Sequence, residues 1–270
     1  VTMLLISSYY FLYMIAFFAV FYVFIYSIMQ RYSLKRTVGK VAGLGGMGIL
    51  GVLIGGVALV PIADTFLESA RAGVLAAKGT SHLLSPYKGK TLGTIVARFF
   101  SNHMLGIDKD YTGYLNYYEG MILAVSILTV FAVSYFIVKK STRVKALVLT
   151  VFLVFLTIMP LTSRILVFTK HSYRWTFMIC FVEALVIGCF LQDVFREKNR
   201  KTVLTGSILA IVICGGLLAW MYSFKNIKPD HKVTAGVIGF LAVYLILFAV
   251  GTSVKKMYRI FPAAVLLVLI

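Results

Sequence analysis

Long apolar runs constrain this chain more than any other feature of its sequence. Seven stretches follow one another, most of them roughly 17–25 residues long, which is the length that crosses a bilayer as a helix. A bilayer core holds no water, so a crossing segment must be a helix or part of a closed barrel. The ten-residue alternation of a membrane barrel is missing. The runs therefore predict an all-α, polytopic transmembrane helix bundle. The expected spans are residues 9–29, 41–63, 120–138, 146–159, 175–191, 203–222 and 233–250, with a truncated eighth from about 260.

The fourth run is shorter than the others and meets Pro160. Its helix is expected either to begin inside the preceding basic connector or to continue past the proline. The chain opens on Val1 and stops inside the eighth apolar run, so we expect a fragment of a longer protein, with residues 1–270 forming a single transmembrane domain.

The composition supports the membrane interpretation and argues against a nucleic-acid partner. The chain is 60% hydrophobic and 13% charged, whereas soluble domains are about 45–50% apolar and about 25% charged. The formal net charge is +18, but the basic residues flank the apolar runs and do not line one soluble face. We interpret them as topology determinants and as anchors for anionic membrane lipids.

The distribution of the basic residues predicts the orientation of the chain. Alternate short connectors hold fifteen Lys or Arg and two acids, while the opposite side holds twelve over far more residues, with six acids. Dense basic residues in short loops mark the cytoplasmic side. Residues 64–118 then form one long extracytoplasmic loop.

The long loop is expected to carry two short amphipathic helices that lie on the outer membrane surface. Residues 65–77 form the first, and residues 91–105 form the second, with Arg98 and His103 on its polar face. A turn-rich stretch, residues 106–116, leads into the third span.

A group of basic residues in the connector after the fourth span is a candidate anion site. Two arginines can grip a phosphate bidentately, and a lipid-linked phosphate lies at that depth. The alternative is interfacial anchoring, with Trp175 in the aromatic belt. The group consists of Arg164, Lys170, His171 and Arg174.

Several carboxylates are candidates for chemistry, each with a simpler alternative. Asp64 or Glu68 can act as a general base for an acceptor hydroxyl, but Glu68 also stands three residues before Arg71, as in an exposed ion pair. Glu183 lies within the fifth span, so it faces a wet cavity or, protonated, bonds across helices.

Two further motifs lie in or beside the long loop. Asp108 and Asp110 match the D-x-D pattern that holds a divalent metal in sugar transferases, although the same tripeptide fits a solvated turn. The tyrosines that follow can stack on a sugar ring or belong to the aromatic belt. These tyrosines are Tyr111, Tyr114, Tyr117 and Tyr118.

The glycines and cysteines of the spans indicate packing. Residues 46–51 read G-x-G-x-x-G, but a dinucleotide site needs a strand before this motif, and here it lies inside a span. Gly51 and Gly55 instead form a G-x-x-x-G pair that permits close helix approach. The cysteines lie inside apolar runs and indicate no disulfide or zinc site. They are Cys180, Cys189 and Cys214.

Three stretches, in this order, resemble the YfhO family of bacterial membrane proteins, which are of the GT-C glycosyltransferase type. The first is the polar-Tyr-Tyr entry of the opening span at residues 6–14. The second is Val60-Pro61 followed by Glu68-Ser69-Ala70-Arg71. The third pairs Asn116-Tyr117-Tyr118-Glu119-Gly120 with Arg174-Trp175-Thr176-Phe177.

The resemblance implies an enzyme of the bacterial plasma membrane. Such a transferase takes a sugar from a polyprenyl-phosphate carrier on the outer face and places it on a cell-surface polymer such as lipoteichoic acid. Arg71 and Arg174 match family positions and would contact the phosphate or the substrate. The catalytic acid of GT-C enzymes lies in an earlier outward loop, so the base is expected outside this chain, and a divalent metal is a candidate cofactor.

Two other functions fit the same layout. A transporter or flippase of lipid-linked saccharides would use broken spans and midplane polar groups, for which Glu183 and the glycine-rich second span give some support. A non-catalytic membrane scaffold would bind a partner through the long loop.

Overall fold

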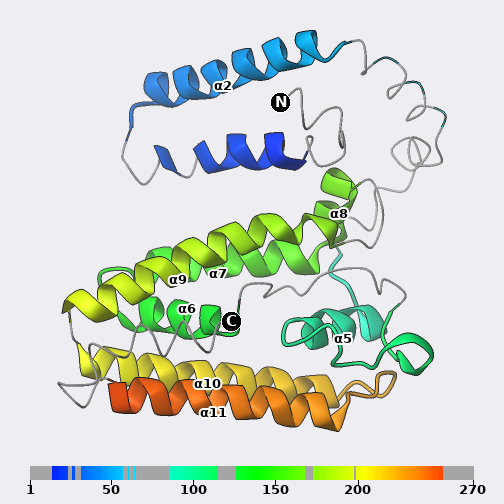
Figure 1. Ribbon diagram of the computed structural model, residues 1–270, viewed down its shortest axis with the longest axis vertical. Helices are drawn as coiled ribbons and strands as arrows, with labels where there is room; N and C mark the ends of the chain where they lie inside the picture. The colour runs from blue at the N-terminus through cyan, green and yellow to red at the C-terminus, as the bar shows by residue number, and fades with distance from the viewer. Residues whose placement is uncertain are drawn as a thin grey trace. The chain divides into compact units, whose positions relative to one another are not determined.

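The computed structural model describes residues 14–23, 26–27, 32–56, 60, 64, 68, 85–114, 126–167, 173–197 and 199–251 (Figure 1). Throughout these residues the regular structure is helical, which confirms the all-α prediction. The chain divides into two compact units, each described by itself. Unit 1 comprises residues 1–82 and 161–178, and unit 2 comprises residues 83–160 and 179–270.

Four helices in the described residues are long and apolar enough to cross a membrane, or five if one bent pair counts as a span. The expected seven spans plus a truncated eighth are therefore not confirmed. Two expected spans correspond to shorter apolar helices, residues 14–23 and α6 (Leu128–Val138), and the eighth lies outside the described residues. The four long helices are α2 (Leu34–Ile54), Arg174–Arg196 within η2 (Arg174–Thr176) and α9 (Phe177–Glu197), α10 (Arg200–Tyr222) and α11 (His231–Gly251).

The bent pair consists of α7 (Arg143–Ile158) and α8 (Pro160–Val167), which meet at an angle of 76°. Met159 between them is extended, with φ −97° and ψ 128°. A proline disfavours helical geometry in the residue before it and suits the first position of a new helix. The first sequence-based alternative holds, because the helix begins in the basic connector at Arg143. The second does not, because the helix ends at Ile158 and a separate helix begins at Pro160.

Unit 1 contains the glycine-rich helix α2. The Ser33 side chain caps its start by accepting a hydrogen bond from the Arg36 backbone N–H at 3.4 Å. Gly51 and Gly55 are both buried, as the close-packing interpretation requires. The G-x-G-x-x-G motif lies entirely within this helix, so the strand that a dinucleotide site needs does not precede it.

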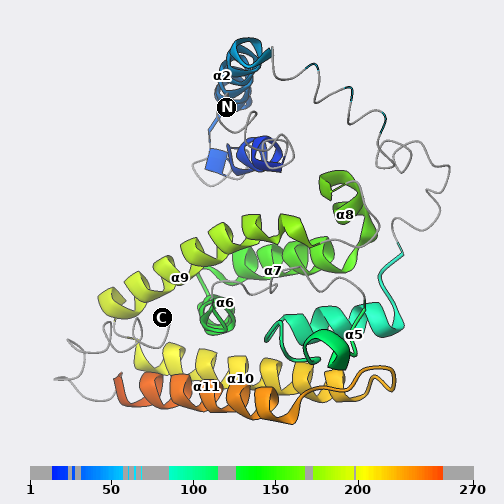
Figure 2. The same ribbon diagram turned by 45° about the vertical axis from the view of Figure 1, so that its right-hand side comes forward.

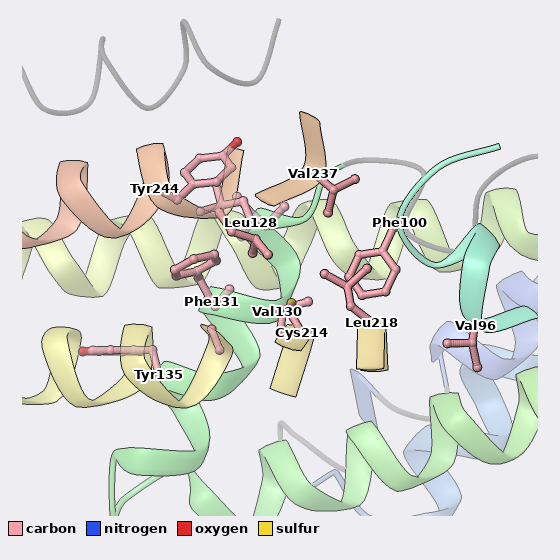
Figure 3. Packing of buried hydrophobic residues seen from close by; sticks show 14 of the residues in the cluster. Val96, Phe100, Leu128, Val130, Phe131, Tyr135, Cys214, Leu218, Val237 and Tyr244 are labelled. Atoms are coloured by element: carbon pink, nitrogen blue, oxygen red, sulfur yellow. The ribbon is translucent and has the colours of Figure 1, made fainter. Parts of the chain in front are cut away.

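In unit 2, α6 lies between α10 and α11 on one side and α7 and α9 on the other (Figures 1 and 2). Gly206 of α10 allows the closest approach, because a Cβ there would stand 2.8 Å from the Tyr135 Cα of α6. The interior is rich in aromatic rings. Phe131 lies 5.6 Å from Tyr244 and 5.5 Å from Phe248 between ring centroids (Figure 3). Such pairs add about 0.5–1.5 kcal/mol each beyond their burial.

We call one end of unit 2 the connector end. It consists of residues 139–145 and 193–201. Lys139 Nζ pairs with Asp193 Oδ2 at 2.7 Å and so joins the end of α6 to α9. Arg143 donates to the carbonyl oxygens of Ile137 at 2.9 Å and Val138 at 3.2 Å. These bonds satisfy carbonyls that the end of α6 leaves without helical partners.

Candidate functional site

The opposite end of unit 2, here the loop end, consists of residues 85–114 and 223–234. It contains α5 (Gly89–Arg98), which stands beside the C-terminal part of α10 (Figures 1 and 2). Gly93 lets α5 pack against the connector that follows α10, because a Cβ there would meet the Ile227 Cδ1 at 2.9 Å and the Phe224 Cγ at 3.1 Å.

The sequence predicted an amphipathic helix over residues 91–105. A helix forms inside this range, and its apolar face packs against protein. Ile95, Val96 and Phe100 are buried, and Val96 and Phe100 belong to the core of unit 2 (Figure 3). An amphipathic pattern shows which face seeks an apolar surface, but not whether lipid or protein supplies it.

Thr112 joins the two segments of the loop end. Its hydroxyl donates to the carbonyl oxygens of Lys228 at 3.1 Å and Leu105 at 3.3 Å, and it accepts from the Lys228 backbone N–H at 3.0 Å. A fourth bond runs from the Thr112 backbone N–H to the Leu105 carbonyl at 2.9 Å. One side chain therefore fixes the register between two parts of the chain that are 116 residues apart.

A second group of contacts strengthens this junction. The Asp230 backbone N–H donates to the carbonyl of Met104 at 2.7 Å, while the Asp230 carboxylate caps α11 by accepting from Lys232 N–H at 2.7 Å. The Met104 side chain is fully buried, and the Thr234 hydroxyl lies 3.5 Å from its sulfur. The loop end is thus a packed layer and not a loose linker.

Arg98 was expected on the polar face of its helix, but it is 3% exposed. Its Nη2 donates to the Tyr111 hydroxyl at 3.4 Å, and that hydroxyl donates to the Tyr114 carbonyl at 2.9 Å. The Tyr114 backbone N–H in turn donates to the Thr94 hydroxyl at 2.8 Å. Tyr111 therefore serves the internal packing of the layer. Tyr117 and Tyr118 lie outside the described residues.

The loop end also carries six lysines, all exposed, of which five stand outside α11. These five come from the start of α5, from η1 (Asp108–Asp110) and from the connector between α10 and α11. Among the described residues, none of their ammonium groups has a hydrogen-bond or ion-pair partner. We call this set the lysine surface. It consists of Lys88, Lys90, Lys109, Lys225 and Lys228.

Two of the four predicted anion-binding residues, Arg164 and Arg174, are described, and both belong to unit 1. Arg174 begins η2 (Arg174–Thr176), where its neighbours Tyr173 and Trp175 are 6% and 2% exposed. The Thr176 hydroxyl donates to the Tyr173 carbonyl at 2.8 Å and fixes the turn. The Arg174 side chain is exposed, so a rigid turn presents it at the surface of unit 1.

Arg164 is half-buried on α8, between the buried Ser163 and the exposed Ile165. Trp175 is almost fully covered by protein, which does not suit a belt residue at an exposed surface. Lys170, His171 and Arg71 lie outside the described residues.

The predicted carboxylates belong to different units. Asp64 and Glu68 are exposed, helical residues of unit 1. Glu183 of α9 is 2% exposed and belongs to unit 2. Asp110 is exposed in η1, and the side chain of Asp108 is not described. Across the described part of the chain, no three His, Cys, Asp or Glu residues group as metal ligands.

Sequence reasoning missed the junction formed by Thr112 and the lysine surface beside it. Thr112 stands in a turn-rich stretch without periodicity, so nothing in the sequence marks its partner at Lys228. The lysines were visible as basic residues, but the sequence assigned them to separate loops.

A family model described as bacterial membrane protein YfhO matches residues 1–270. The curated proteins and the solved structures yielded no match. The apolar helices α2, α10 and α11 agree with a protein embedded in a membrane. The family match covers the whole sequence, and the chain therefore belongs to the YfhO family of bacterial membrane proteins.

Proposed function

We propose that this chain is part of a GT-C-like glycosyltransferase of the bacterial plasma membrane. The reaction transfers a sugar from a polyprenyl-phosphate carrier to a cell-surface polymer such as lipoteichoic acid. It takes place on the outer face, where the loop of residues 64–118 lies. Membership of the YfhO family and the resemblance of its motifs to GT-C enzymes support this proposal.

The observation that carries the proposal is the exposed Arg174 on its rigid turn. Transfer from a lipid phosphate leaves negative charge on the departing phosphate, and a fixed cation lowers the barrier by stabilising that charge. A guanidinium is always charged and can hold two phosphate oxygens at once. Buried Tyr173 and Trp175 hold the backbone on both sides of Arg174, so the position from which the guanidinium extends is fixed.

Arg164 is the second candidate phosphate contact, with Arg71 and His171 as further proposals from the sequence. Asp64 and Glu68 are candidate bases for the acceptor hydroxyl, since both are exposed. An acceptor base must come within hydrogen-bond reach of that hydroxyl in the substrate complex.

The test is sugar transfer in proteoliposomes with a radiolabelled polyprenyl-phosphate sugar and an acceptor polymer. We expect Arg174→Ala to lower kcat/KM by about a hundredfold or more, and Arg174→Lys to recover only part of it, because an ammonium cannot reproduce the bidentate contact. Arg200→Ala is the matched control, because Arg200 is an exposed arginine at the connector end. Full transfer by both Arg174 variants would refute the assignment.

A transporter or flippase of lipid-linked saccharides is the second candidate. The 76° break between α7 and α8 favours it, because broken spans line substrate pathways in transporters. The fully buried Glu183 of α9 adds an ionisable group inside a candidate span. Flipping of a fluorescent lipid-linked saccharide in proteoliposomes, without sugar transfer, would favour this function over the transferase.

A further inference from the structure

The lysine surface offers positive charge that the fold does not use. Residues 85–114 and 223–234 contain seven Lys or Arg against three acids, a net charge of +4 with histidine neutral. Arg98, one of the seven, is buried, and Asp230, one of the three acids, caps α11. The exposed positive charge of the loop end is therefore carried by lysines whose ammonium groups contact no described residue.

The backbone that carries these lysines is fixed. Thr112 bonds directly to the backbone of Lys228 and follows Lys109 by three residues. Gly93 packs on Phe224 and Ile227, which places the start of α5 against the segment that contains Lys225. Three separate segments therefore present their charges on one preformed layer, so binding would not require the backbone to become ordered.

The residue type indicates what kind of anion this layer suits. A single phosphate is best held by arginine, whose planar fork matches two oxygens. Lysine is a compact, mobile point charge that attracts any nearby anion without a required geometry. Five lysines spread over three segments exceed what one phosphate can contact, but they fit a chain of repeated negative charges.

We propose that the lysine surface docks a linear, phosphate-bearing polyanion, and that this polymer is the acceptor of the proposed sugar transfer. The inference rests on the proposed function and assigns the donor phosphate and the acceptor phosphates to different kinds of basic residue. The single phosphate of the donor suits the planar fork of arginine, and the repeated phosphates of the acceptor suit the lysine surface.

The structure favours a polymer over the headgroups of the bilayer. At the connector end, the cations stand in connectors of a few residues between long helices, where headgroups lie. At the loop end, Lys225 and Lys228 also stand in such a connector, between α10 and α11, but Lys88, Lys90 and Lys109 belong to the layer of residues 85–114, which forms no candidate span. Three of the five lysines are therefore carried by a folded layer that is not part of a candidate span.

The test measures polymer binding to the full chain in nanodiscs of uncharged phosphatidylcholine. The probe is fluorescently labelled inorganic polyphosphate, followed by anisotropy at about 50 and about 200 mM salt. We expect the triple variant Lys109→Gln, Lys225→Gln, Lys228→Gln to bind about tenfold or more weakly and to show a shallower salt dependence. The control triple Lys140→Gln, Lys145→Gln, Lys201→Gln removes the same charge from exposed positions at the connector end and should change affinity less than twofold.

The outcomes separate this inference from the proposed function. Equal weakening by both triples, or by neither, would overturn the lysine surface. Unchanged polyphosphate binding, with lost association to phosphatidylglycerol vesicles, would overturn it in favour of lipid. Wild-type transfer with an unchanged acceptor KM in the loop-end triple would refute the docking role and leave the transferase standing. Polyphosphate binding that the loop-end triple abolishes, in a protein that transfers no sugar, would refute the transferase and leave the surface standing.

Discussion

The two ends of unit 2 are both rich in basic residues, yet they use them differently. At the connector end, charged side chains join the elements: Lys139 pairs with Asp193, and Arg143 caps the last carbonyls of α6. At the loop end, the joints are made by Thr112, by backbone groups and by buried apolar side chains, while the lysines stay exposed. The α10 helix of 23 residues separates the two ends by about 34 Å.

This difference shows that net charge alone does not reveal what a basic segment does. A cation that makes structural hydrogen bonds, as Arg143 does, has part of its charge offset by the carbonyl oxygens that it contacts. An exposed lysine on a rigid layer keeps its charge for an external partner. The contacts of the basic side chains, and not their number, therefore distinguish the end where they stabilise the bundle from the end where they remain able to bind a partner.

The largest expected effect lies between the two ends, where Gly206 of α10 packs against Tyr135 of α6. A leucine at position 206 would place its Cβ 2.8 Å from the Tyr135 Cα, so two backbones would have to move apart. We expect Gly206→Leu to destabilise the protein by about 3 kcal/mol or more. Thermal unfolding in detergent measures this. Gly216→Leu, on the same helix but with nothing within 4 Å of its Cβ position, should leave the midpoint nearly unchanged.

At the loop end, we expect the loss of the Thr112 hydroxyl to lower stability locally and by an intermediate amount. Thr112→Val keeps the shape of the side chain but removes its bonds to Lys228 and Leu105, at a cost of about 1–2 kcal/mol. Hydrogen exchange of residues 104–114 and 228–230 should rise while that of α6 stays constant. Thr150→Val is the control, since the Thr150 hydroxyl bonds only within its own helix, to Ala146. Faster exchange throughout unit 2 would contradict a local junction.

The sequence predicted the long helices of unit 2 well because their ends carry local signals. The runs 203–222 and 233–250 became α10 and α11, which begin a few residues earlier, where Asn199 and Asp230 cap them. Apolar length and capping residues are properties of a short segment, so they can be recognised without knowing the rest of the fold.

The loop end could not be predicted in the same way. The position of α5 depends on Gly93 meeting Phe224 and Ile227, and the position of Thr112 depends on Lys228. Both contacts link residues more than a hundred positions apart, and hydrophobic periodicity carries no information about them. Arg98 shows the same limit, since a charged residue predicts exposure until its partners, such as Tyr111, are known.

A smaller effect is expected from the ion pair at the connector end. Lys139 and Asp193 have side chains that are 18% and 28% exposed, so solvent screens part of their attraction. A double-mutant cycle with Lys139→Met and Asp193→Asn should give a coupling of about 1 kcal/mol or less. The cycle isolates the pair from the helix-capping bonds of Arg143. A coupling indistinguishable from zero would mean that the connector end is held by packing and capping alone.

The lysine surface itself is expected to have the smallest effect on stability. It therefore gives the sharpest contrast with the connector end. Removing three of its charges breaks no contact with any described residue, so the loop-end triple variant should unfold within about 2 °C of the wild type. Relief of mutual repulsion would if anything raise its midpoint slightly. A drop of more than about 5 °C would show that these lysines stabilise the layer, and the loop end would then resemble the connector end in using its cations for structure.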